Sequence, residues 1–178
     1  MPKCFAVLAG VVLGLLAQIT PSYAELYLFI DGLVGESKAP NRQGWSDIAS
    51  VSWGVGEPPP GSATKVQFRR LELSKPHDSI SPALALLAST GKAFRELKVE
   101  GTRKIGDMEI VTTRVRLAGV RVANIATAGL DQGTANLITD SLAFSFDTIT
   151  WTVIKLDDVN RPVATFSTCF DVRTNIPC

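Results

Sequence analysis

Runs in which apolar and polar side chains alternate fill most of the chain after residue 25, and they predict a protein built mainly of β-strands. The clearest run covers residues 47–55. Its two faces would be Ala49, Val51, Trp53 and Val55 on the apolar side, and Ile48, Ser50, Ser52 and Gly54 on the other. A strand with one apolar face and one small, mostly polar face is typical of a sheet that separates a core from water.

Other segments of the same kind predict strands over residues 26–31, 66–74, 94–100, 108–126, 142–153 and 163–173. In three of them the apolar phase shifts by one residue: between Phe68 and Leu71, at 118–119, and at 147–148. A phase shift indicates a bulge or a bend. Repeated bends in long strands allow a sheet to curl into a barrel.

One segment, residues 81–91, has the pattern of a helix, with Leu84, Leu87 and Ala88 on one face. Ser81 is a suitable N-cap, Pro82 fits the first turn and Gly91 a C-terminal stop. Polar or proline-rich loops are predicted over residues 36–44 and 56–64. The predicted fold is therefore all-β, a barrel of two packed antiparallel sheets with one short flanking helix.

The first 24 residues predict a secretory signal peptide. Lys3 is their only charge, an apolar run of 12 residues follows over 6–17, and Ser22 and Ala24 supply small residues at a cleavage site. The run is short of the roughly 20 residues that a membrane-spanning helix needs, which makes a permanent anchor the weaker alternative. We therefore divide the chain into a leader, residues 1–24, and one exported domain, residues 25–178, with no membrane insertion after leader removal.

Charge and cysteine content narrow the possibilities for the mature domain. Without Lys3 the 18 basic residues become 17, which equals the 17 acidic residues. A net charge near zero argues against nucleic acid as a partner. Removal of Cys4 leaves Cys169 and Cys178, and an even pair in an exported chain predicts a disulfide. Two unpaired thiols on a loose tail are the alternative.

Several short motifs of this chain resemble the Hcp family, the tube proteins of bacterial type VI secretion. The resemblance begins at residues 26–55, where I-D-G and G-E-S precede a polar loop and an S-W-G strand. It continues through F-R-R-L-E-L-S-K at 68–75 and the D-x-x-S-P block with its leucine-rich helix up to residue 92. The segments 120–129, 141–153 and 162–175 resemble later strands of the family.

The resemblance implies a structural protein, not an enzyme, that self-associates into six-membered rings, which stack into a conduit for secreted effectors. It implies that the loop with Gly35, Glu36, Ser37 and Trp45 reaches a neighbouring subunit. It also implies that Ser50 and Ser52 line the lumen. The leader and the two late cysteines depart from the family pattern. They leave open the alternative of an exported binding module that acts alone.

No pattern in the sequence supports catalysis, a metal site or a cofactor. His77 is the only histidine, and a catalytic histidine needs an orienting acid and a nucleophile. We interpret it as a solvated loop residue. One histidine and two distant cysteines have no zinc spacing, and S-T-G-K at 89–92 lacks the order of a phosphate loop. Trp53 and Trp151 are predicted to pack in the core, not to bind sugar.

Overall fold

The computed structural model describes residues 24–58, 60–61, 66–106, 108–131 and 136–178. The predicted leader lies outside these residues except for Ala24, with which the first strand begins. Within them, no helix has the length and apolar content that crossing a membrane requires.

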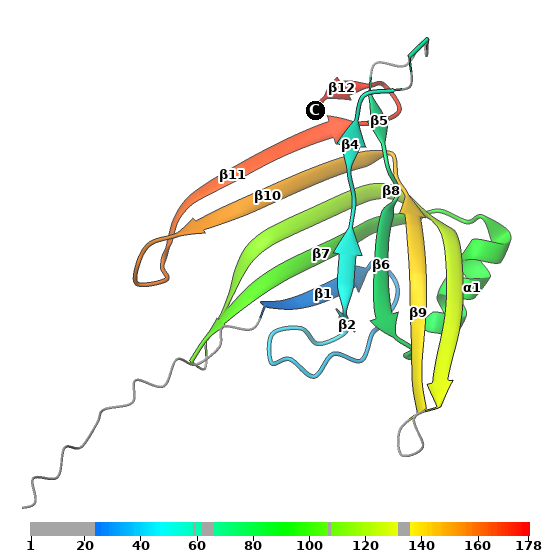
Figure 1. Ribbon diagram of the computed structural model, residues 1–178, viewed down its shortest axis with the longest axis horizontal. Coiled ribbons are helices and arrows are strands. Elements are labelled where there is room, and N and C mark those ends of the chain that lie inside the picture. The colour runs from blue at the N-terminus through cyan, green and yellow to red at the C-terminus, as the bar shows by residue number, and fades with distance from the viewer. Residues whose placement is uncertain (1–23, 59, 62–65, 107, 132–135) are drawn as a thin grey trace, which may run out of the picture.

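Strands dominate the described residues, as the alternating pattern predicted (Figure 1). The first six strands are β1 (Ala24–Ile30), β2 (Ser46–Ile48), β3 (Ser50–Ser52), β4 (Val55–Gly56), β5 (Gln67–Phe68) and β6 (Leu71–Pro76). They are followed by α1 (Ser81–Thr90), β7 (Phe94–Ile105), β8 (Met108–Asp131), β9 (Asn136–Ser145), β10 (Thr148–Leu156), β11 (Pro162–Asp171) and β12 (Ile176–Pro177).

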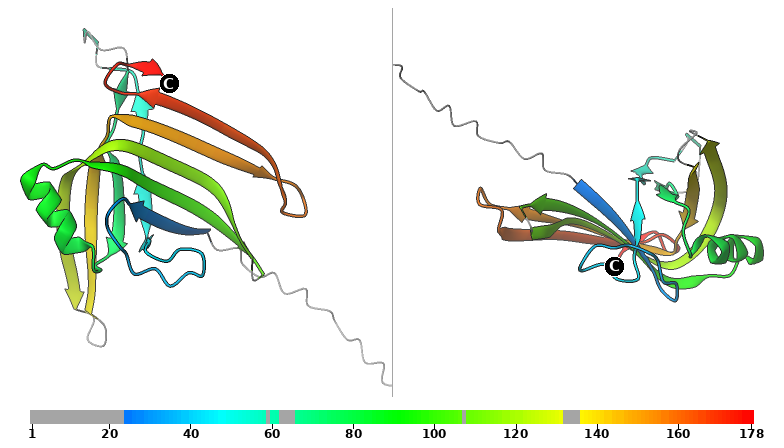
Figure 2. Two further views of the ribbon diagram at one scale, coloured as in Figure 1. Left: turned by 180° about the vertical axis from the view of Figure 1, so that it is seen from behind. Right: turned by 90° about the horizontal axis from the view of Figure 1, so that it is seen from below.

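The strands form two antiparallel layers that share β8. The large layer has the order β12-β11-β10-β8-β7-β1-β2, and the small layer has the order β3-β6-β9-β8. β2 and β3 follow one another with one residue between them; β2 pairs with β1 and β3 pairs with β6, so the layers meet again there. Figure 2 shows the small layer rising steeply from the large one. The predicted barrel of two packed antiparallel sheets with one short helix is confirmed.

The bend that joins the layers lies in β8 at Gly119, the position of the predicted phase shift. Gly119 has a φ of 63°, a left-handed conformation that favours glycine, and a Cβ there would lie 2.2 Å from Asp147 Oδ2. β8 pairs with β10 up to Ala118 and with β9 from Arg121 onward. Gly119 thus permits a sharp bend that other residues would not fit, and the bend lets one strand take part in both layers.

Three predicted strands are wrong in extent, because the chain changes its pairing partners within each; one of the pieces, β5, pairs with β4 in a separate two-stranded sheet. The segment 142–153 is two strands, β9 and β10, that separate at residues 146–147. The segment 66–74 divides into β5 and β6, which belong to different sheets. In 47–55 the break falls at Ala49, which is exposed, while Ile48 is 7% exposed and belongs to the core. In 66–74 and 142–153 the predicted phase shift therefore marked a change of sheet, and not a bulge in one strand, whereas no phase shift announced the break in 47–55.

Helix α1 covers one end of the barrel and ends, as predicted, at Gly91 with a φ of 64°. Leu84 is buried, and Leu87 and Ala88 pack against the core. The predicted cap is wrong: Ile80 occupies the N-cap position, and no side chain caps the helix there. The Ser81 hydroxyl is buried and bonded elsewhere, as described below.

The core lies between the two layers. Its fully buried members come from both layers and from α1, and they include Leu71, Leu84, Leu97, Leu117, Phe144 and Ile149. Trp53 and Trp151 pack against this core, with ring centroids 5.3 Å apart, as the core interpretation of these residues predicted.

Candidate functional site

The outer face of the small layer carries mostly small polar side chains. Adjacent strands align Ser50 with Ser74 and Ser141, and align Ser52 with Glu72 and Ala143. Ser50 and Ser52 are both exposed, and the hydroxyls of Ser50 and Ser74 lie 2.7 Å apart. We call this surface the polar face; its residues are Ser50, Ser52, Glu72, Ser74, Asn124, Ser141 and Ala143, and they line a shallow groove of about 410 Å³.

The small layer ends in two strand edges that pair with no other described strand. One is the outer edge of β3, whose only partner is β6. The other is the edge of β8 after residue 121, where β8 has β9 as its only strand partner. Unpaired edges expose backbone donors and acceptors that another strand can satisfy. The polar face therefore lies between two edges that are available for pairing.

The loop of residues 31–45 lies against β1 and β7 of its own chain. Gly35 forms an isolated bridge with Gly44, and the Ser37 amide donates to Trp45 O at 2.7 Å. A Cβ on Gly35 would lie 2.3 Å from Ser46 Oγ, so the bridge needs glycine there. Glu36 is exposed. Of the four predicted interface residues, the structure thus leaves Glu36 most open to a neighbour.

The aromatic end of this loop is held by a partly buried charge cluster. The Trp45 ring lies 5.4 Å from the Phe29 ring, and the Arg42 guanidinium lies 5.2 Å from the Trp45 and Tyr27 rings. Arg42 Nη2 is 2.8 Å from Glu100 Oε2, and both side chains are almost fully buried. Such contacts fix the base of the loop and leave its tip to the surface.

On the outer face of the large layer, β7 and β8 present a second set of ion pairs. Glu96 pairs with Arg116 and with Lys98, the latter at 2.8 Å. Burial alone would raise the pKa of Glu96, but the hydrogen bonds and charges of Lys98 and Arg116 outweigh it and lower the pKa below its ordinary value. This carboxylate is therefore ionised in the folded protein across the neutral range.

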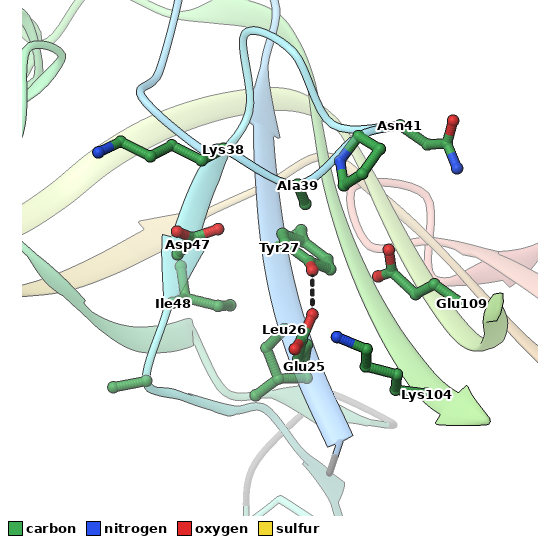
Figure 3. Close-up of a pocket in the computed structure, with 12 residues that line it drawn as sticks. Glu25, Leu26, Tyr27, Lys38, Ala39, Asn41, Asp47, Ile48, Lys104 and Glu109 are labelled. Atoms are coloured by element: carbon green, nitrogen blue, oxygen red, sulfur yellow. Dashed lines mark hydrogen bonds between the residues drawn. The ribbon is translucent and has the colours of Figure 1, made fainter. Parts of the chain in front are cut away.

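Beneath the loop, a pocket of about 580 Å³ is lined by β1, β2, the loop and the β7–β8 hairpin (Figure 3). The Tyr27 hydroxyl donates to Glu25. The pKa of Tyr27 is raised, mainly because the side chain is partly buried and in addition because the carboxylates of Glu25 and Glu109 lie close to it. Lys38 and Lys104 also line the pocket. Within the described part of the chain, no group of three or more acidic, histidine or cysteine side chains is arranged to hold a metal ion.

A buried polar network that the sequence analysis missed joins the small layer to α1. Lys75 and Asp140 are both 0% exposed, with Nζ 3.2 Å from Oδ2. Lys75 Nζ also donates to Ser81 Oγ and Pro76 O, each at 2.9 Å, and pairs with Asp78. Burial alone would raise the pKa of Asp140, but hydrogen bonds from His77, Ser81, Thr127 and Lys75 lower it to about 2.

A signal for this network was present in the sequence. Leu71, Leu73 and Lys75 alternate along β6, so Lys75 occupies a core position of its strand. Asp140 precedes Leu142 by the same two-residue step in β9, and the two polar positions face each other in the pairing. A lysine in phase with buried leucines indicates a buried charge that needs an acidic partner.

The network brings His77, Asp140 and Ser81 together, but not in an order that activates a nucleophile. His77 Nδ1 lies 2.9 Å from Asp140 Oδ1, and Ser81 Oγ donates to the same carboxylate. Asp140 thus stands between the histidine and the hydroxyl, and no described bond links those two groups directly. Ser81 is 2% exposed. His77 lies exposed in the loop between β6 and α1, as interpreted, with 41% of its side chain open to solvent, and it is in addition a partner of a buried carboxylate.

The C-terminal tail is joined to β11 by a bond between Cys169 and Cys178, whose Cα atoms are 5.3 Å apart. The pairing of β12 with Phe170 and Asp171, and the hydrogen bond from Cys178 N to Cys169 O, extend the contact along the edge of β11. The cysteines thus hold a short strand over one end of that edge.

A protein-family model and several solved structures match this chain. Residues 27–153 match the family model described as "Type VI secretion system effector, Hcp". No curated protein sequence matches the chain.

Three solved structures show the same fold. "Structure of a type six secretion system protein" has 21% identity and a TM-score of 0.80, covering 88% of this chain and 100% of that one. Hcp1 from Salmonella typhimurium has 18% identity and a TM-score of 0.72, covering 87% and 99%. A type VI secretion system effector from Yersinia pestis has 20% identity and a TM-score of 0.66, covering 83% and 99%.

Proposed function

We propose that this chain, which belongs to the Hcp family of type VI secretion system effectors, is a structural subunit that assembles head to tail into rings. The polar face would line the lumen of the ring, and the ring would carry secreted effector proteins. The observation that supports this most strongly is the small layer itself, with one polar face and two unpaired edges. Six subunits per ring is the number that the resemblance to tube proteins implies.

Ring closure would follow from pairing the two edges of the small layer. The edge of β3 in one subunit would pair with the edge of β8 in the next, so that the small layers form one continuous wall. Such an interface uses two different surfaces of the same chain and closes into a ring when the rotation between subunits permits. The polar face would then continue around the inside of the wall.

Ser50 and Ser52 suit a lumen because their side chains are short and hydrogen-bonding. They keep the passage wide and wet, and they bind no cargo strongly. Weak contacts repeated around a ring retain an effector by multivalency and still release it. Glu72 is the charged member of the polar face, and cargo contacts would include this carboxylate.

Light scattering of the mature chain tests the ring directly, and cysteine cross-linking tests its geometry. A panel of variants would combine one cysteine at residues 50–52 with one at residues 124–128. On oxidation, we expect at least one combination to give covalent multimers up to the size of the ring. Rings in light scattering without cross-links anywhere in the panel would show that another surface forms the contact.

A second candidate function, an exported binding module that acts outside a secretion apparatus, is favoured by the bonded pair Cys169 and Cys178. Disulfides persist in oxidising compartments, which matches export by the predicted leader. Mass spectrometry of the exported protein would show Glu25 at its N-terminus if the leader is cleaved after Ala24. A protein that keeps residues 1–24 and reaches the medium only with an active secretion apparatus would contradict export by the leader.

A further inference from the structure

Two surfaces with exposed apolar side chains lie on helix α1 and on the β10–β11 hairpin, which Figure 2 places at opposite ends of this subunit. The first is the outward side of helix α1. The helix contains no charged residue, and Leu86 in its middle is 64% exposed. Pro82 and Ala85 beside it are exposed as well. The other exposed residues of the helix, Ser89 and Thr90, donate their hydroxyls to the carbonyls of Ala85 and Leu86.

The second surface is the part of the large layer that extends beyond the small layer. Ile149, Trp151 and Val153 share one face of β10, and Phe166 pairs with Val153 from β11. The face is buried at Ile149, but Val153 is 49% exposed and Phe166 is 62% exposed. We call this surface the wing; it consists of Thr113, Trp151, Val153, Phe166 and Thr168, which the pairing of β8, β10 and β11 places on one face.

The positions of the two surfaces relate directly to the two edges of the small layer. The wing begins beside β3: Val51 and Trp53 share a groove of about 480 Å³ with Thr113 and Val115. Helix α1 contacts β8 and lies beside the part of that strand that forms the other edge of the small layer (Figures 1 and 2). Joining the β8 edge of one subunit to the β3 edge of the next therefore brings α1 of the first to the wing of the second.

From this placement we infer that the outward side of α1 docks on the wing of a neighbouring copy, with Leu86 against Val153 and Phe166. The inference rests on the proposed ring and adds a second layer to its interface. Edge pairing alone supplies backbone hydrogen bonds, each of which contributes little net stability. The helix contact supplies the apolar burial that holds the copies together. α1 contains no charged residue, so no charged group of the helix loses its hydration on contact.

Complementary variants test the contact. Leu86→Glu damages the helix side, Phe166→Glu damages the wing, and each is expected to convert the wild-type ring to monomers. An equimolar mixture retains one undamaged helix and one undamaged wing, so it is expected to give a particle of twice the monomer mass. Val159→Glu is the matched control, because Val159 is 65% exposed in the turn between β10 and β11 and lies outside both surfaces. It is expected to leave the ring intact.

The outcomes separate this contact from the ring itself. A wild-type ring that both glutamate variants retain would overturn the contact alone, and so would a mixture that stays monomeric. A monomeric wild-type chain would overturn the ring and the contact together. A double variant, Leu86→Cys with Phe166→Cys, supplies a second measurement if the glutamate variants fold poorly. These residues lie in α1 and β11, at opposite ends of the subunit, so oxidation is expected to bond neighbouring copies into multimers. An absence of multimers under oxidation would overturn the contact.

Discussion

Lys75→Met removes the ammonium group at the centre of the buried network and is expected to lower the free energy of unfolding strongly. Methionine fills the space of the lysine stem, so the change tests charge and hydrogen bonding more than packing. Asp140, which is 0% exposed, and Asp78, whose side chain is 10% exposed, would lose their shared cation. Removing one partner of a buried ion pair costs about 3–5 kcal/mol.

Urea unfolding of the mature chain, at one protein concentration for all variants, measures this loss. With a urea dependence of about 2 kcal/mol per molar, the midpoint is expected to fall by roughly 1.5–2.5 M. The exposed Lys155→Met is the control and should change the free energy of unfolding by less than about 0.5 kcal/mol. Adding Asp140→Asn to Lys75→Met should cost less than the sum of the single changes. A loss under about 1 kcal/mol for Lys75→Met would refute the assigned role of the network.

The pH dependence of stability gives an independent measurement of the same network. The pKa of Asp140 is lowered from 3.8 to about 2, so the unfolded chain binds its proton more readily than the folded one. The corresponding stability is fully present above about pH 5 and is lost as the pH falls through 4 toward 2, by about 2 kcal/mol in total. In the Asp140→Asn variant, the free energy of unfolding should change less with pH between pH 5 and pH 2 than in the wild type. An unchanged slope between pH 4 and 2 would contradict the assignment.

Three further changes test other parts of the account. Gly119→Ala should cost more stability than Gly106→Ala in urea unfolding, because both glycines have a positive φ but a Cβ has open space only at Gly106; equal losses would show that the corner of β8 is not crowded. Thiol titration of the denatured, non-reduced mature chain should find no free thiol, and Cys178→Ser, which breaks the bond to Cys169, should cost about 2–3 kcal/mol; two free thiols would disprove the bond. Trp45→Ala should weaken assembly in sedimentation experiments with little loss of folding, and unfolding of the isolated variant would count against it.

Periodicity alone predicted a large part of this fold, for a physical reason. Side chains of a strand alternate between core and surface, so residues 94–100 and 108–126 could be recognised from their sequence. Gly119 could be recognised as a corner because the apolar phase shifts there. What alternation could not predict is which strand pairs with which. That information lies in contacts between distant residues, and it made β9 and β10 look like one strand.

The candidate site was less predictable than the fold. Ser50 and Ser52 could be assigned to a polar face from their strand, because one face of an amphipathic strand is visible in the sequence. The Lys75–Asp140 pair joins residues 65 positions apart, and its partners come together only after β6 and β9 pair. The use of Ser81 in this network, instead of as a helix cap, has the same origin. A local motif predicts a local role, and tertiary contacts replaced that role here.

The mass of the mature chain in solution tests the central claim most directly. Size-exclusion chromatography with light scattering, at neutral pH and with the Cys169–Cys178 bond intact, measures it without a standard of known shape. A head-to-tail ring predicts one particle with a mass of six subunits of residues 25–178. A single species with the mass of one subunit, unchanged as the protein is concentrated, would contradict the claim.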